Sequence, residues 1–224
     1  MNRLAEHVVD AGYAERVLTE RQLARILGGS DDSRYALVKR ALQAGALIKI
    51  KRGQYVLADK LRKQPLHPFH LAQALVAGSY VSMESALGLH GWIPEGVHTV
   101  TSVTPGRRSI EHDHSEFGRF TFHPLAVNRL ALLEEVERRV VGGQAILVAK
   151  PLRALIDLAA FQKRPWEGLG WIVEGLRIDL EQLLETPKRD FQALRPVYKH
   201  KAARAFLDQL TTAVSDLKAK GQQR

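Results

Sequence analysis

Short apolar stripes at helical spacing, separated by polar stops, mark the start of the chain. Three residues recur at the spacing of one helix face: Leu23, Ile26 and Leu27. Before them, Thr19 and Gln22 fit a capping box, in which a hydroxyl accepts a hydrogen bond from the amide three residues later. Gly28-Gly29 ends the pattern. We therefore predict a helix over residues 20–27, followed by a tight turn.

The next apolar stripe predicts a second helix, which Ser30 or Asp31 can cap. One face carries Tyr35, Val38, Ala41, Leu42 and Gly45. The opposite face carries Ser33, Ala36, Lys39, Arg40 and Gln43. These opposite side chains are small or can form hydrogen bonds, which suits entry into a DNA major groove.

Alternation then replaces helical spacing. Residues 47–57 predict two short strands around Lys51-Arg52-Gly53, and Gly53 supplies the positive φ of the turn. A supporting helix is expected from Asn2 to Tyr13, with Leu4, Val8 and Val9 facing inward. This order is that of a winged helix-turn-helix, which we place at residues 1–62, with the hairpin as the wing.

The middle of the chain predicts a mixed α/β domain over residues 69–165. A polar stretch with two prolines, residues 60–68, is the expected linker. Ser82 is expected to cap a helix that ends at Gly91 and buries Trp92 and Ile93. The other expected elements are helices at 70–77 and 151–161 and strands at 97–104, 118–123 and within 137–149.

Residues 166–224 predict a helical carboxy-terminal part, so that the whole chain is α+β. Leu169–Leu184 has the pattern of one amphipathic helix, Thr186-Pro187 is a boundary, and a further helix is expected from Arg189 to about Leu217. Cationic residues gather there: Lys188, Arg189, Arg195, Lys199, Lys201 and Arg204. This patch could contact DNA, hold an acidic protein or simply be solvated.

The charge distribution points to a polyanionic partner at the two ends of the chain. The net charge is +9, from 33 Lys and Arg against 24 Asp and Glu. Residues 1–65 have 13 basic and 7 acidic side chains and residues 151–224 have 13 and 9, whereas the middle has 7 and 8. Cysteine is absent, which excludes disulfides and thiolate sites. With no signal peptide or membrane span in the sequence, we expect a cytoplasmic protein.

Double-stranded DNA is the partner that the charge and the predicted winged helix favour. The expected contacts are Ser33, Arg34, Tyr35, Lys39 and Arg40 from the helix and Lys49, Lys51, Arg52 and Gln54 from the wing. Arg40 is expected to read a base, and Lys51 and Arg52 to hold phosphates, together worth about two units of salt slope. A winged helix that docks a protein is the alternative.

The sequence predicts neither an enzyme nor a cofactor. His112, Asp113, His114 and Glu116, with His123, are the densest group of metal-ligand types, but their position beside a turn favours solvated side chains. A nuclease would need clustered carboxylates to hold magnesium, and Glu134, Glu135 and Glu137 are expected on a helix surface. We therefore expect no metal site and no catalysis.

Several short motifs in order resemble a known family. They are Tyr80-Val81-Ser82, Ser85-Ala86-Leu87, His90-Gly91, Ile93-Pro94-Glu95 and Thr99-Val100-Thr101, then Leu152, Ala154-Leu155 and Asp157-Leu158, and the Lys51-Arg52-Gly53 and Tyr55 wing. Over residues 15–165 the chain resembles AbiEi, the regulator and antitoxin of type IV toxin–antitoxin pairs in abortive infection.

The resemblance implies a repressor that binds inverted repeats in its own promoter. It also implies a partner, the nucleotidyltransferase toxin AbiEii, which the carboxy-terminal part would counter. A stand-alone winged-helix regulator, whose middle domain senses a ligand or a partner, stays open beside it.

Overall fold

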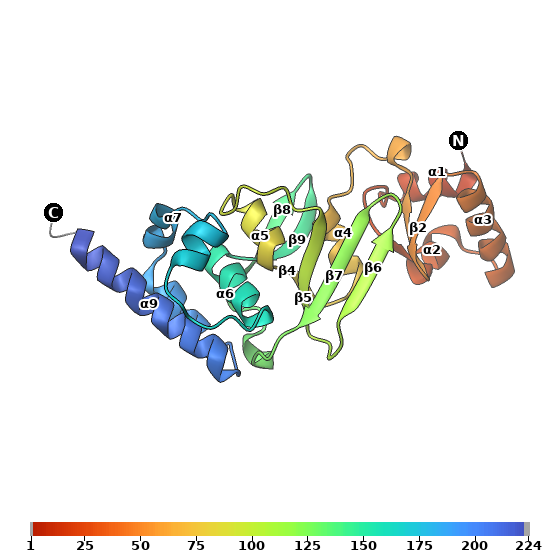
Figure 1. Cartoon of the computed structure of the whole chain (residues 1–224). Coiled ribbons are helices and arrows are strands. Elements are labelled where there is room, and N and C mark those ends of the chain that lie inside the picture. The colour runs from red at the N-terminus through yellow and green to blue at the C-terminus, as the bar shows by residue number, and fades with distance from the viewer. Residues whose placement is uncertain (1, 222–224) are drawn as a thin grey trace. The chain divides into compact units, whose positions relative to one another are not determined.

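The computed structural model describes residues 2–221 and divides the α+β chain into two compact units (Figure 1). The first unit is Met1–Leu75 with Val140–Ala145, and the second is Val76–Arg139 with Ile146–Arg224. Among the described residues, no helix combines the length and the apolar character needed to span a bilayer.

Four α-helices and a small sheet form the first unit. The elements are α1 (Arg3–Asp10), β1 (Leu18–Thr19), α2 (Glu20–Leu27), α3 (Asp31–Gln43), β2 (Leu47–Lys51), β3 (Gln54–Leu57), the 3-10 turn η1 (Asp59–Leu61) and α4 (Pro68–Leu75). The predicted capping box is present: Thr19 Oγ1 accepts from the Gln22 amide at 3.2 Å, and Gln22 Oε1 accepts from the Thr19 amide. The predictions for α2, α3 and the hairpin are confirmed as elements.

The sheet of this unit has the order β1-β3-β2, with antiparallel neighbours. Leu47 pairs with Leu57 and Lys49 with Tyr55, and Gly53 closes the β2–β3 hairpin at φ 75° as predicted. The strand β1 was not predicted, because two residues are too short to show alternation. It pairs Leu18 with Tyr55 and so joins the start of α2 to the hairpin.

The core of the first unit lies where its helices meet the sheet. Its fully buried side chains include Leu4, Val8, Leu18, Ala41 and Leu57. Two expectations for the supporting helix were wrong. It ends at Asp10 rather than Tyr13, where the amides of Ala11 and Gly12 donate to the carbonyls of His7 and Val9. Val9 is 37 % exposed rather than buried.

The second unit is built on a mixed sheet of order β6-β7-β5-β4-β9-β8. Its strands are β4 (Tyr80–Val81), β5 (Thr99–Thr104), β6 (Ile110–His114), β7 (Gly118–Pro124), β8 (Val136–Val141) and β9 (Gln144–Ala149). β4 pairs antiparallel with β5 and parallel with β9, and β5 pairs parallel with β7. The tip between β8 and β9 belongs to the first unit.

Helices pack around one another and against this sheet (Figure 1). They are α5 (Met83–Leu89), α6 (Pro151–Phe161), α7 (Leu180–Glu185), α8 (Lys188–Leu194) and α9 (Lys201–Gly221), with the 3-10 turn η2 (Arg129–Ala131) and the π-turn η3 (Trp171–Gly175). α5 packs on β5 and α6, and α6 packs on α8 and α9. Trp92 and Ile93 are buried, as predicted.

Three predictions of helical structure were wrong in this unit. Leu169–Leu184 is not one helix: the chain leaves η3 at Gly175, and Arg177 takes a φ of 55°, which a right-handed helix excludes. The helix expected from Arg189 to Leu217 is broken between Leu194 and Lys201. Glu134 and Glu135 lie in the turn before β8, and Glu137 lies in β8, rather than on a helix. Glu135 has a φ of 54°.

Candidate nucleic-acid interface

The α2–α3 pair is joined by a turn whose backbone conformation favours glycine. Gly28 and Gly29 have φ values of 61° and 69°, which glycine adopts without a side-chain clash. Ser30 then caps α3, and its Oγ accepts from the Ser33 amide at 3.3 Å. The turn therefore fixes where α3 begins and which face it turns outward.

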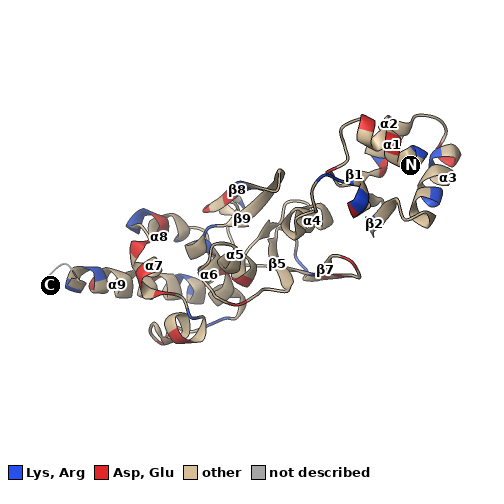
Figure 2. Ribbon diagram, turned by 90° about the horizontal axis from the view of Figure 1, so that it is seen from above, with Lys and Arg blue, Asp and Glu red and all other residues tan. Residues whose placement is uncertain are grey.

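The outward face of α3 carries several of the predicted contact residues. Ser33, Lys39, Arg40 and Gln43 are exposed. Tyr35, which helical spacing placed on the inward face, is 73 % exposed. Acidic positions at the start of α3 lie close to the basic ones, as Figure 2 shows.

The Arg34 side chain binds the residues of the α2–α3 turn and does not extend into solvent. Its Nη1 donates to the carbonyl of Gly28 at 3.2 Å and to that of Gly29, and its Nη2 forms an ion pair with Asp31. The side chain is 22 % exposed. A DNA contact from Arg34 would require these bonds to break. In the structure, Arg34 therefore stabilises the α2–α3 turn.

The cationic residues of the hairpin differ in how available they are. Arg52 and Lys49 are exposed, whereas Lys51 is half-buried and its Nζ donates to the carbonyl of Leu75 at 2.5 Å, at the end of α4. Gln54 is half-buried, and its Oε1 has no hydrogen-bond partner among the described residues. Arg52 is thus the cation of the turn that is open to a ligand.

Two surface hollows lie beside α3, and each is lined by some of the predicted DNA-contact residues. Tyr35 and Arg34 line a cavity of about 450 Å³ with Tyr55 of β3. Burial, followed by the charge of Glu20 and the nearby Tyr35, raises the pKa of Tyr55. Ser33 and Arg40 line a smaller hollow of about 150 Å³, together with Arg3 and His7 of α1. Lys39 lies on neither flank.

A buried ionic network lies in the second unit, and the sequence did not lead us to expect it. Arg153 and Asp157, one turn apart on α6, are both fully buried and joined by a 2.9 Å hydrogen bond from Nε to Oδ1. The Asp157 carboxylate also accepts from Tyr198 at 2.7 Å, Ser82 at 2.8 Å and Tyr80 at 2.9 Å. Ser82 was expected to cap α5; its hydroxyl instead donates to this stronger acceptor.

The network satisfies both of its charges. Arg153 Nη1 also donates to the carbonyl of Glu134 at 2.9 Å. Burial lowers the pKa of Arg153, but the charge of Asp157 and the contributions of Tyr198 and Tyr80 outweigh burial, so that the pKa is raised. With its partners fixed and its surroundings apolar, the network ties α6 to β4 and to the segment before α9.

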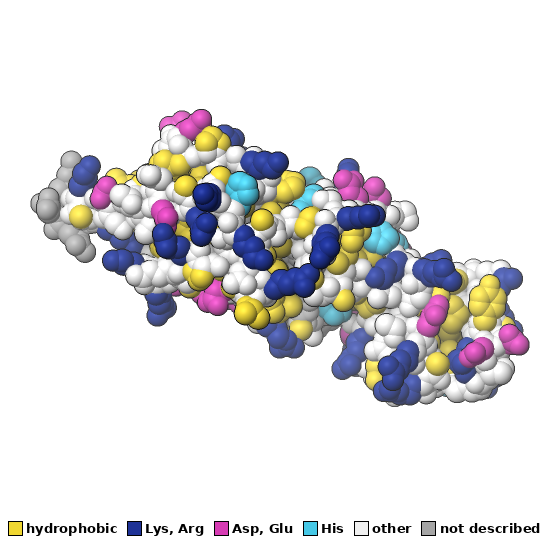
Figure 3. Space-filling model, turned by 90° about the horizontal axis from the view of Figure 1, so that it is seen from below, with side chains coloured by type: hydrophobic (Ala, Val, Ile, Leu, Met, Phe, Trp, Pro, Cys, Tyr) yellow, Lys and Arg dark blue, Asp and Glu magenta, His cyan; other side chains and the backbone are white. Residues whose placement is uncertain are grey.

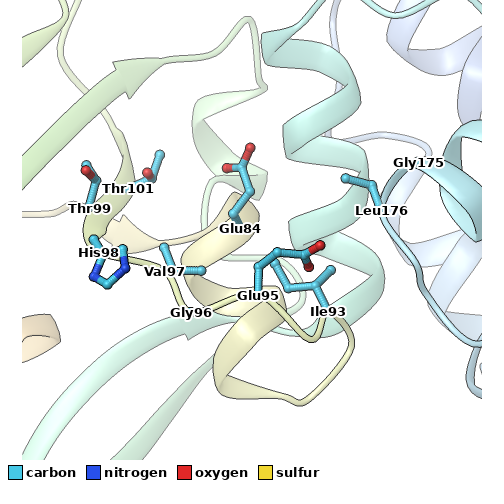
Figure 4. A pocket seen from close by; sticks show the side chains of 10 residues that line it. All are labelled: Glu84, Ile93, Glu95, Gly96, Val97, His98, Thr99, Thr101, Gly175 and Leu176. Atoms are coloured by element: carbon cyan, nitrogen blue, oxygen red, sulfur yellow. The ribbon is translucent and has the colours of Figure 1, made fainter.

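A surface hollow of about 480 Å³ lies beside α5 (Figure 4). The view shows the Glu84 carboxylate in its middle, with Thr99, Thr101 and His98 on one side and Glu95 on the other. Arg177 binds Glu95 through a 2.8 Å hydrogen bond from Nε, and this bond lowers the pKa of Glu95. Among the described residues that line the hollow, Glu84 is the one unpaired carboxylate, which is too few ligands for a divalent cation.

The acidic and histidine residues of the types that bind metals are engaged in ion pairs and hydrogen bonds. Arg119 forms ion pairs with Glu111 and Asp113 on β6, and His114 Nδ1 accepts from the Glu116 amide at 3.1 Å. Lys150 pairs with Glu135 at 3.0 Å. Within residues 2–221, no three His, Asp or Glu side chains gather as a metal site.

The predicted carboxy-terminal basic patch is spread over two helices. Lys188 and Arg189 begin α8, whereas Lys201 and Arg204 begin α9 and Lys199 precedes it. Arg195 is paired with Asp208 through a 2.9 Å hydrogen bond. One face of the second unit nevertheless shows many more Lys and Arg than Asp and Glu side chains (Figure 3).

Comparison with known proteins identifies no relative of this chain. No protein-family model matches the chain, and no curated protein matches it.

Proposed function

We propose that the chain is a sequence-specific repressor that binds double-stranded DNA through its first unit, acting as a winged helix-turn-helix. The observation that carries the proposal is the exposed polar face of α3, preceded by the capped α2 and the Gly28-Gly29 turn and followed by a hairpin with a cationic tip. Helix, tight turn, helix and hairpin in this order is the arrangement of that motif.

In this proposal α3 enters the major groove and the β2–β3 hairpin lies against the backbone. Arg40 and Lys39 are exposed on α3, and Arg is the side chain that most often reads guanine through two hydrogen bonds. Arg52 and Lys49 are exposed on the hairpin, where they contact phosphates. The net charge of +6 over residues 1–65 supports a polyanionic partner.

We further propose that the protein autoregulates an AbiE-type operon and is the antitoxin of a nucleotidyltransferase toxin. The support is the ordered set of motifs between residues 15 and 165 that resembles AbiEi. Tyr80, Ser82 and Asp157, three residues of those motifs, meet in the buried network. The proposal makes the chain a binding protein and assigns it no catalysis.

The test of DNA binding compares the upstream region of the protein's own gene with an unrelated duplex of equal length, by fluorescence anisotropy. Wild-type protein should prefer the upstream duplex. Arg40→Ala should weaken that binding by about 10- to 100-fold, as expected for one lost base contact, and barely alter binding to the unrelated duplex. Arg189→Ala, which removes a side chain that is 85 % exposed on α8, is the matched control.

Equal binding of the two duplexes by wild-type protein would rule out a sequence-specific repressor, and metal-dependent cleavage of plasmid DNA would point to a nuclease. The antitoxin part is tested separately. The proposal requires a nucleotidyltransferase gene beside this one. Cells that express the product of that gene should regain growth when this protein is co-expressed, and Arg40→Ala should still restore growth. Failure to rescue would overturn the antitoxin role alone.

A further inference from the structure

A cleft of about 310 Å³ opens in the second unit, at the end of α6 and the start of α9. Its walls come from three stretches of chain that lie far apart in sequence: residues 124–126, 159–164 and 198–203. None of the residues discussed above as DNA contacts on α3 or the hairpin lies there. The proposed DNA binding gives no role to this part of the molecule.

Small side chains make the cleft hollow and apolar. Five alanines line it: Ala126, Ala159, Ala160, Ala202 and Ala203. Pro124, Leu125 and Phe161 complete the apolar wall, and the Tyr198 side chain also lines it while its hydroxyl is held by Asp157. An apolar hollow of this size, at the low end of ligand pockets, suits a compact organic molecule.

The charged side chains of the cleft are both cations. Lys163 and Arg164 line it beside the His200 imidazole, and within the described chain no Asp or Glu does. Arg164 lies over the Trp171 ring, 5.0 Å from its centroid, and its Nε is buried without an acceptor among residues 2–221. The first turn of the 21-residue helix α9 contains no acidic residue, so its positive end adds to the same potential.

We propose that this cleft binds a small organic anion, a carboxylate carried on a compact apolar body. The apolar body would displace water from the alanine wall, and the carboxylate would pair with the charges of Lys163 and Arg164, both of which line the cleft. A nucleic-acid backbone would reach Lys163 and His200 at the surface but would not fill the alanine-lined space. This inference goes beyond the proposed function and does not depend on it.

The probe is phenylacetate, with the neutral phenylacetamide as its matched analogue, added to the full-length protein. Binding is followed by tryptophan fluorescence, because Trp171 lies beneath Arg164, and is quantified by calorimetry. Phenylacetate should give a saturable response. Phenylacetamide should bind at least about tenfold more weakly, the factor expected when a charge-assisted hydrogen bond is lost.

Two variants locate the site. Ala160→Leu fills the cleft and should abolish binding, whereas Ala219→Leu, on the exposed end of α9, should not. Lys163→Gln removes an exposed charge without disturbing the core and should weaken phenylacetate at least fivefold, with Lys188→Gln as its control. Equal binding of acid and amide, no saturable response to millimolar phenylacetate, or full affinity in Lys163→Gln would each overturn the proposal. So would a Lys163→Gln variant that loses DNA affinity but keeps phenylacetate affinity.

Discussion

At the scale of single residues, the Asp157 carboxylate concentrates more interactions than any surface ion pair described above. It accepts hydrogen bonds from Arg153, Tyr80, Ser82 and Tyr198, and both charged partners are fully buried. Removing one partner of such a pair leaves the other charge in an apolar interior. The network is therefore a point where a single substitution affects the whole second unit.

Asp157→Asn should lower the free energy of unfolding by about 3–5 kcal/mol, because Arg153 would be left as an uncompensated buried cation. Equilibrium urea unfolding measures the change. Asp208→Asn removes the partner of Arg195 from a surface pair whose side chains are 46 % and 68 % exposed. That control should cost less than about 1 kcal/mol. A loss in Asp157→Asn no larger than in the control would contradict the role given to the network.

The tyrosines of the network predict instability at alkaline pH. Burial, followed by the charge of Asp157, raises the pKa of Tyr80 and Tyr198 well above 10. Above about pH 10 the unfolded chain therefore releases protons that the folded chain retains. Each tyrosine then lowers the free energy of unfolding by about 1.4 kcal/mol per pH unit.

Tyr198→Phe should reduce the alkaline loss between pH 10 and 11 by about 1 kcal/mol, because an unfolded tyrosine is only half ionised at pH 10. Urea unfolding at the two pH values measures the difference. Between pH 8 and 9 the wild-type and variant curves should run parallel, offset by the lost hydrogen bond. An unchanged slope above pH 10 would show that Tyr198 does not stay protonated in the folded state.

The network could in part have been anticipated from sequence. Arg153 and Asp157 have opposite charges, are spaced four apart and stand among apolar residues of α6, a pattern typical of a buried pair. Ser82 could not have been placed, because its acceptor lies 75 residues away and only the fold brings the two together. Tyr35 was misplaced for a similar reason: helical spacing gives a direction but not which neighbours cover it.

At the scale of elements, the spacing of apolar residues predicted that helical segments exist better than it predicted where one helix continues into the next. Ile172 and Leu183 of the supposed single helix are both buried, yet they belong to separate turns. The packing of Trp171 on Phe206, with ring centroids 5.8 Å apart, accompanies the π-turn, and Ile178 is buried between the two pieces. Whether a side chain is buried depends largely on its own polarity. Whether a helix continues depends also on contacts with residues far away in the sequence, which the spacing of apolar residues does not encode.

The hairpin predicts unequal contributions from two neighbouring cations. Arg52→Ala should lower the slope of log Kobs against log salt concentration by about 0.9, the value for one lost phosphate contact. Lys51→Ala should lower it by less, because Lys51 Nζ is bonded to the Leu75 carbonyl. Anisotropy titrations at several salt concentrations measure both slopes. Equal losses would mean that Lys51 leaves Leu75 to bind DNA, and would restore the two-unit value expected from sequence.

At the scale of the whole molecule, the basic excess lies in two regions, and the proposed function uses the first. Replacing Lys199, Lys201 and Arg204 together by Gln should therefore leave the salt slope of duplex binding unchanged, although it removes three positive charges. The measurement is the same set of titrations, with Arg52→Ala as the positive control. A slope reduced by two units or more would show that the second unit also contacts DNA.

The first unit is discontinuous along the chain, because it includes the tip between β8 and β9, and the chain therefore crosses between the units three times. Gln144 binds this tip to the rest of the unit: its Oε1 accepts from the His67 amide at 3.0 Å, and its Nε2 donates to the Pro65 carbonyl at 3.0 Å. A protease nick after Leu75 should therefore leave two fragments that co-elute until denaturant separates them. For the same reason, residues 1–75 cannot be transferred to another protein as an intact unit. A fragment that ends at Leu75 would lack Gln144 and its hydrogen bonds to Pro65 and His67.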